Sequence, residues 1–174
     1  MKRLVYILLA VIVCSLGACD NGGGDGGGKS VYIAGDVMDE NYYNFGGYWK
    51  DGTWILLQNA YSTGSLTYET QSSASSIAVS ASTVYIGGSC FNSTTSKWMS
   101  GYWVLNGSKT PTWVELAKLA SNKDAGVQSI TIDGGTVYAG GYCINSSSVS
   151  VAGYWVSDGS ATPAWVELAN PNGS

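Results

Sequence analysis

The sequence predicts an all-β protein built from three similar units. The segment TVYIGGSC, which starts at Thr83, recurs as TVYAGGYC from Thr136, and a more divergent copy, SVYIAGDV, starts at Ser30. The copies stand at intervals of 53 residues, and self-similarity at such a period is typical of a repeat architecture. Each copy is rich in β-branched and aromatic residues, and no stretch of the chain shows a capped, amphipathic helical pattern. We therefore expect units made of strands.

Further motifs recur in register with these segments. The motif GYW occurs three times, at residues 47–49, 101–103 and 153–155. A second tryptophan begins a short apolar run in each unit, at Trp54, Trp113 and Trp165. The segments SIAV from Ser76 and SITI from Ser129 form a further column that the first unit lacks.

Turn signals such as DGG and DGSATP separate these segments, so a complete unit should hold four antiparallel strands in two hairpins. We expect the units to span residues 31–75, 76–128 and 129–174, with the first strand missing from the first unit. The tryptophans of the repeated columns are expected to lie in the core between sheets.

A double glycine, a tyrosine and then a tryptophan eleven residues later resemble the kelch repeat. The second unit has Gly87-Gly88, Tyr102 and Trp113, and the third has the same pattern from Gly140-Gly141 onward. The first unit departs from it, since Ala34-Gly35 replaces the double glycine. This resemblance, which spans residues 31 to 168, implies the four-stranded blades of a β-propeller. Three blades do not close a propeller, so we expect either a partial propeller or one that self-association completes.

The N-terminus resembles the export signal of a bacterial lipoprotein. Lys2 and Arg3 precede LVYILLAVIVCSL, an apolar stretch shorter than the roughly 20 residues of a membrane-spanning helix. The sequence LGAC, ending at Cys19, resembles a lipobox and implies a signal peptide over residues 1–18 and a lipid on Cys19. Residues 19–30 then form the anchor and a glycine-rich tether. We expect a domain anchored in the bacterial cell envelope, on the periplasmic or the surface face. An ordinary secretory signal is the alternative.

The composition argues against several kinds of function. The chain has no histidine and no arginine after Arg3, which excludes an imidazole base and bidentate arginine clamps on anionic substrates. Its formal net charge of −4 argues against a nucleic acid partner. We expect a protein that is not an enzyme and uses no cofactor or metal. The acidic cluster Asp36, Asp39 and Glu40 contains suitable Ca²⁺ ligands, but its spacing matches no known calcium loop.

Two further pairs of residues occupy equivalent positions in the repeat. Glu115 and Glu167 should face solvent on alternating strands. Cys90 and Cys143 stand in one column, and equivalent positions of neighbouring blades lie too far apart for a disulfide. Both cysteines are expected to be buried thiols.

The segments between the second and third strands of the units differ most in sequence. They read DVMDENYYNF, SCFNSTTSKWM and YCINSSSVSVA. Variable loops on a rigid scaffold commonly carry binding function, and exposed aromatic residues dominate binding surfaces. Tyr42, Tyr43, Phe91 and Trp98 are therefore the candidate contacts to a protein or a glycan. The leading hypothesis is a membrane-anchored binding protein. The alternatives are a carbohydrate-active propeller enzyme, which needs two carboxylates about 5 to 9.5 Å apart, and a purely structural envelope protein.

Overall fold

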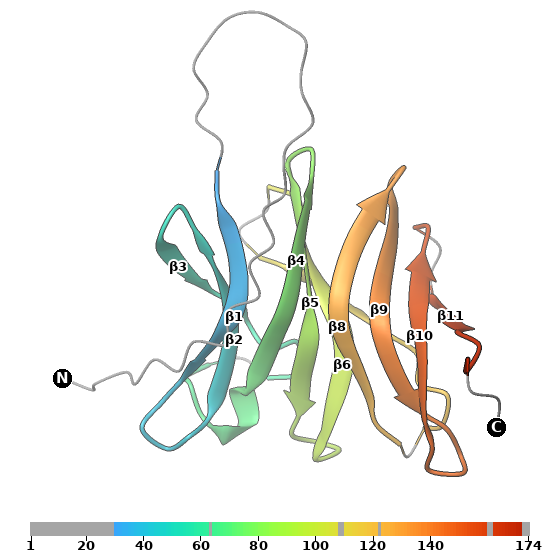
Figure 1. Cartoon of the computed structure of the whole chain (residues 1–174). Coiled ribbons are helices and arrows are strands. Elements are labelled where there is room, and N and C mark those ends of the chain that lie inside the picture. The colour runs from blue at the N-terminus through green and yellow to red at the C-terminus, as the bar shows by residue number, and fades with distance from the viewer. Residues whose placement is uncertain (1–29, 63, 108–109, 122, 160–161, 172–174) are drawn as a thin grey trace, which may run out of the picture.

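Figure 1 shows a computed structural model of the chain, which describes residues 30–62, 64–107, 110–121, 123–159 and 162–171. The predicted signal peptide, Cys19 and nearly all of the tether lie outside the described residues. The described part is all-β, as predicted, apart from one short 3-10 helix, η1 (Tyr68–Thr70). In these ranges no helix has the length and apolar character needed to cross a membrane.

The strands form three antiparallel sheets, one for each unit of the repeat. The strand order is β1-β2-β3 in the first sheet, β4-β5-β6-β7 in the second, and β11-β10-β9-β8 in the third. The first sheet contains β1 (Tyr32–Met38), β2 (Asn44–Lys50) and β3 (Thr53–Leu56). The second contains β4 (Ser72–Ser80), β5 (Thr83–Asn92), β6 (Lys97–Leu105) and β7 (Thr112–Glu115). The third contains β8 (Ala125–Asp133), β9 (Thr136–Ile144), β10 (Ser150–Ser157) and β11 (Ala164–Glu167).

The predicted four strands per complete unit are confirmed, and the first sheet has three, as expected. The first strands of the other two units are longer than the sequence suggested, because β4 begins at Ser72 and β8 at Ala125. A β-bulge interrupts each of them, between Ala74 and Ser76 in β4 and at the equivalent place in β8. A bulge shifts the alternation of side chains by one residue, which hides the start of the strand from a sequence pattern.

The three sheets stand face to face in a row, with the second sheet in the middle (Figure 1). Side chains from facing sheets fill two apolar cores. The core between the first and second sheets includes Ala34, Tyr48, Ile77, Ile86 and Trp103. The core between the second and third includes Tyr102, Leu116, Ile130, Ala139 and Trp155. The three described sheets do not close into a ring. The first sheet packs on the second and the second on the third.

In the second and third units, the tryptophan of the GYW motif ties its sheet to the preceding one. Trp103 Nε1 donates a hydrogen bond to the carbonyl oxygen of Gln58 at 3.0 Å, and Trp155 Nε1 donates to that of Ala117 at 2.8 Å. Gln58 and Ala117 are equivalent residues, each lying just after the last strand of the preceding sheet. Both tryptophans are 1% exposed, which confirms their predicted place in the core. An indole N–H that is buried in this way needs such a partner.

The glycine of each GYW motif makes room for the other tryptophan of its unit. A Cβ atom on Gly101 would overlap the ring of Trp113, which lies across it from the next strand. A Cβ atom on Gly47 would overlap the ring of Trp54 in the same way, and one on Gly153 would overlap that of Trp165. The paired rings then meet at 4.6 Å between centroids for Trp103 and Trp113. Glycine is therefore required here for a close approach and not for an unusual backbone angle.

Replacing Gly101 by alanine should lower the free energy of unfolding by about 2 kcal/mol, because the added methyl group overpacks against the Trp113 ring. Gly140 is the matched control: a Cβ there would meet nothing closer than Ser129 Cβ at 4.0 Å. Gly140→Ala should change stability by less than about 1 kcal/mol. Urea unfolding followed by tryptophan fluorescence measures both, and equal losses in the two variants would contradict this account of the motif.

Candidate functional site

The hairpins with variable sequences gather at one end of the molecule. They join β1 to β2, β5 to β6, and β9 to β10, and η1 lies beside them at the lower end of Figure 1. Each hairpin occupies the same place in its unit, so stacking the sheets brings the three together. This is the end at which the sequence places the candidate binding residues, and we call it the hairpin end.

Four aromatic rings form a row across the hairpin end, from the first sheet to the second. Successive ring centroids lie 5.8 Å apart from Tyr43 to Tyr68, 4.8 Å from Tyr68 to Phe91 and 5.8 Å from Phe91 to Trp98. The rings meet edge to face or tilted, the arrangements that the charge distribution of aromatic rings favours. We call these four residues the aromatic row.

Local structure places each ring of the aromatic row. Phe91 and Trp98 face each other across the β5–β6 pair. Tyr43 follows a turn in which Asp39 Oδ1 accepts hydrogen bonds from the backbone N–H of Asn41 at 2.9 Å and of Tyr43 at 3.0 Å. Aspartate side chains commonly stabilise turns in this way. Tyr68 begins η1.

Two buried amide side chains fasten the aromatic row to the ends of the sheets. Asn59 Nδ2 donates to the carbonyl oxygens of Gln71, at 2.6 Å, and Phe91, at 2.9 Å. Gln71 Nε2 donates to the carbonyl oxygen of Tyr68 at 3.1 Å, and Gln71 Oε1 accepts from the N–H of Asn44 at 3.4 Å. Buried amides with their partners satisfied hold a backbone in one arrangement. Sequence reasoning missed both residues because they lie in a connection whose side chains do not recur in the next unit.

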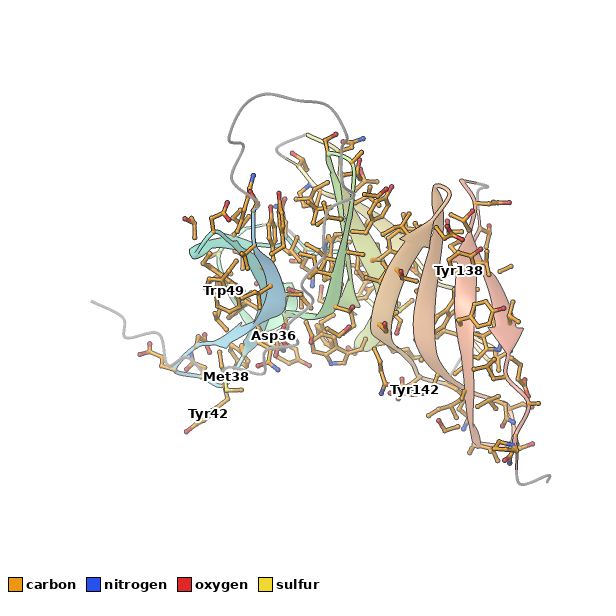
Figure 2. All side chains as sticks on the ribbon, turned by 45° about the horizontal axis from the view of Figure 1, so that its top comes forward. Asp36, Met38, Tyr42, Trp49, Tyr138 and Tyr142 are labelled. Atoms are coloured by element: carbon orange, nitrogen blue, oxygen red, sulfur yellow. The ribbon has the colours of Figure 1, made fainter. Side chains whose placement is uncertain are left out.

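The structure brings three of the four predicted aromatic candidates together and separates one. Tyr43, Phe91 and Trp98 belong to the aromatic row, whereas Tyr42 is 79% exposed at the tip of its hairpin and extends away from the sheets (Figure 2). The expectation that Phe91 is exposed is wrong. It is 4% exposed because its neighbours in the row cover it. Tyr68, which the sequence did not single out, is half exposed and completes the row.

A crevice opens at the hairpin end between the second and third sheets, with a volume of about 320 Å³. Its lining is rich in aromatic, hydroxyl and small residues, together with one carboxylate: Ser73, Ser75, Gly88, Ser89, Trp98, Asp124, Ala125, Gly126, Val127 and Tyr142. Trp98 belongs both to this lining and to the aromatic row. The ring of Tyr142 lies across Gly126, its register partner on β8 (Figure 2).

The crevice exists because the repeat diverges at one column, which holds Asp36, Ser89 and Tyr142. Between the first and second sheets, Asp36 accepts hydrogen bonds at 2.7 Å from Ser73 Oγ and from the N–H of Ala74, and so closes the gap. Between the second and third sheets the equivalent residue is Ser89, whose side chain is too short to reach across. The residue equivalent to Ser73 is glycine, which removes a second side chain.

The buried acid Asp36 is a structural group. Burial raises the pKa of its carboxyl above the usual value, although the hydrogen bonds from Ala74 and Ser73 act in the opposite direction. The sequence had grouped this residue with Asp39 and Glu40 as oxygen ligands, but Asp36 and Asp39 are engaged in separate hydrogen bonds. In the described part of the chain, no three acidic, cysteine or histidine residues lie together as metal ligands.

The other acidic and thiol groups are also held by the fold. Glu115 accepts a hydrogen bond from the hydroxyl of Tyr61, and burial, with this carboxylate beside it, raises the pKa of that hydroxyl. Cys90 and Cys143 are free and buried, as predicted. Burial raises the pKa of the Cys90 thiol to about 12 and also raises that of Cys143. Thiols of this kind are poor nucleophiles. Among the residues lining the crevice, Asp124 is the single carboxylate.

Comparison with known proteins gives no match for this chain, whether among protein-family models, curated sequences or solved structures. Fold and site together define an all-β repeat protein of three stacked sheets with an aromatic-lined crevice at the hairpin end.

The raised pKa of Asp36 predicts a pH-dependent stability difference. The folded state binds the proton more tightly than the unfolded chain, whose carboxyl has its ordinary pKa of 3.8. The contribution of the Asp36 carboxyl to the free energy of unfolding is therefore greatest below pH 3.8 and declines as pH rises through the folded-state pKa. Asp36→Asn removes this dependence. The stability of the native protein relative to this variant should be larger at about pH 3 than at about pH 7 in urea unfolding, and a constant difference would contradict the assignment.

Proposed function

We propose that this protein is a non-enzymatic glycan-binding lipoprotein of the bacterial cell envelope. In this proposal its sheets are blades of kelch-like propeller type, and the crevice at the hairpin end receives a neutral sugar chain. The observation that carries the proposal is the composition of the crevice, in which Trp98 and Tyr142 accompany serine hydroxyls and one carboxylate.

The crevice offers what a sugar requires. One face of a pyranose ring is rich in C–H groups and packs against an aromatic ring, and its hydroxyls need donors and acceptors. Trp98 and Tyr142 supply rings, whereas Ser73, Ser89 and Asp124 supply polar groups. The volume of about 320 Å³ lies at the lower end of the range for small-ligand sites, about 300 to 1,000 Å³. It suits one or two sugar residues.

Neutral sugars are favoured over acidic ones. The chain contains no arginine after Arg3, and its formal net charge is −4. Asp124, the carboxylate in the lining, would repel a sugar acid. Arginine is the side chain that recognises carboxylates and sulfates through two parallel hydrogen bonds, so its absence removes that mode of binding.

Binding without catalysis is favoured because a glycosidase needs two carboxylates on opposite sides of the bond it breaks. Asp124 is the single carboxylate in the lining of the crevice, whereas Asp36 is hydrogen-bonded to β4 and Glu115 to Tyr61. A carbohydrate-active enzyme is accordingly the weaker alternative. Beyond the buried Phe91, the exposed Tyr68 and the partly exposed Tyr43 of the aromatic row give a longer sugar chain a surface on which to lie.

The propeller assignment and the membrane anchor rest on separate observations. Three sheets with equivalent strands pack face to face in sequence order, as neighbouring blades do. The anchor rests on the basic start, the apolar stretch, LGAC and the tether. Together they describe a binding domain held close to a membrane.

Trp98→Ala and Tyr142→Ala should each weaken retention on immobilised neutral oligosaccharides by at least tenfold, because each removes a ring on which the sugar would stack, worth about 1.5 kcal/mol or more. The probe is an array of neutral hexose and N-acetylhexosamine oligomers. Affinities for the bound members are then measured by titration calorimetry.

Tyr42→Ala is the matched control, since Tyr42 is an exposed aromatic residue at the same end but does not line the crevice. Its retention should be unchanged, and all three variants should keep the native circular dichroism spectrum. If the native protein binds no member of the array, or if Tyr42→Ala weakens binding as much as the other two, the crevice is not the glycan site.

The anchor predicts incorporation of labelled palmitate when the protein is produced in a bacterium. Cys19→Ala should abolish the label, because the sulfur and the new amino terminus of Cys19 carry the lipid chains. Cys90→Ala is the control, since this buried thiol is not accessible to the modifying enzymes. Label retained in Cys19→Ala would overturn the lipoprotein assignment.

A further inference from the structure

The third sheet presents a face whose counterpart on the second sheet is buried. Leu116 is 1% exposed beneath the third sheet, but its equivalent, Leu168, is 52% exposed. Tyr102 is 3% exposed, whereas its equivalent, Tyr154, is partly open to solvent. Figure 2 shows Tyr138 on this outer side of the third sheet. We call this surface the trailing face.

The first sheet has the opposite surface uncovered. Trp49 pairs with Trp54 at 4.4 Å, close to the 4.6 Å of the two equivalent tryptophan pairs. Its equivalents Trp103 and Trp155 are 1% exposed, whereas Trp49 is partly exposed and lies at the far end of the row of sheets from Tyr138 (Figure 2). We call this surface the leading face.

Each internal interface joins one leading face to one trailing face through the same tryptophan contact, and β4 or β8 of the leading face makes most of the other contacts. The tryptophan of the leading face donates to the carbonyl of the residue that follows the buried leucine of the trailing face, as Trp155 does to Ala117. Between the second and third sheets, Tyr102 OH of the trailing face also donates a hydrogen bond of 2.9 Å to Ser157 Oγ, at the end of the GYW strand opposite. One chain therefore carries, uncovered at the two ends of the described stack, both partners of the tryptophan contact that it already makes twice internally, although its first sheet has no strand equivalent to β4 or β8.

We propose that a second copy of this chain packs head to tail on the first, the leading face of one copy covering the trailing face of the other. By equivalence with the internal interfaces, Trp49 of one copy donates to the carbonyl of Ala169 of the other and covers Leu168. Tyr154 then reaches Asp51. A contact between two different surfaces continues until it closes, and two copies joined at both ends give a ring of six sheets, a usual number for closed propellers.

A second copy is the occupant that the residues favour. The trailing face requires a partner that places an indole N–H opposite the carbonyl that follows Leu168, and the leading face of this same chain holds Trp49 against Trp54 much as the two internal tryptophan pairs are held. An unrelated protein would have to reproduce it independently. Burying both faces also removes the exposed apolar residues Leu168 and Val166 from water. This burial stabilises the pair by about 25 cal/mol for each Å² of apolar surface.

Sedimentation of the full chain in detergent tests the stoichiometry. We expect a species with twice the mass of one chain that dissociates on dilution. Tyr154→Lys, which places a charge on the trailing face, should shift the protein to the mass of a single chain. Tyr42→Lys at the hairpin end is the control and should stay paired. A native protein that sediments as a single chain at all concentrations would overturn the proposal. That is also the result expected if another protein or a further sheet covers these faces.

Cross-linking tests the head-to-tail arrangement and does not depend on Tyr154. Lys50 adjoins the leading-face tryptophan, Ala169 is its expected neighbour on the other copy, and both are exposed. With a short bismaleimide, a mixture of Lys50→Cys and Ala169→Cys chains should form linked pairs above the background of the unaltered protein, and neither variant alone should. Linked pairs from Ala169→Cys alone would show that two trailing faces meet, which would overturn the proposal.

Discussion

The stack depends on a single repeated contact, in which a buried indole N–H of one sheet meets a carbonyl just after the last strand of the preceding sheet. This contact fixes the depth at which Trp103 and Trp155 enter the core and therefore the spacing of the sheets. The glycine of the GYW motif is required by the same arrangement, because the second tryptophan of the unit lies where its side chain would be. A sheet of this kind has two apolar faces and gains most of its stability from its neighbours.

Regular repeats give a scaffold, and departures from the repeat create the candidate site. The crevice lies where Asp36 has a short equivalent, Ser89, so that the carboxylate that bridges the first and second sheets has no counterpart between the second and third. The aromatic row depends likewise on residues 57–71, a connection longer than its counterpart at residues 116–124. This connection supplies Tyr68 from its extra length, and it supplies Asn59 where the following unit has Lys118.

The same divergence leaves one defect in the third unit. Trp113 Nε1 donates to the hydroxyl of Tyr61 at 3.3 Å, but the equivalent of Tyr61 in the next connection is Ala120, and Trp165 Nε1 is buried without a protein partner among the described residues. A lost hydrogen bond of this kind costs about 1 to 3 kcal/mol. The third sheet thus lacks a hydrogen bond that stabilises the second.

The sequence by itself determined the features that repeat: the all-β class, four strands in a complete unit, the missing first strand, the buried tryptophans and the two unpaired cysteines. These features can be predicted from the sequence because each unit repeats the same local pattern, which must bury the same face of its sheet. The tertiary structure decided what does not repeat. It buried Phe91 under its neighbours, joined Tyr68 to Trp98 through it, extended β4 past a bulge and opened the crevice beside Ser89. No local pattern encodes these, because each depends on how side chains from separate units meet once the sheets are stacked.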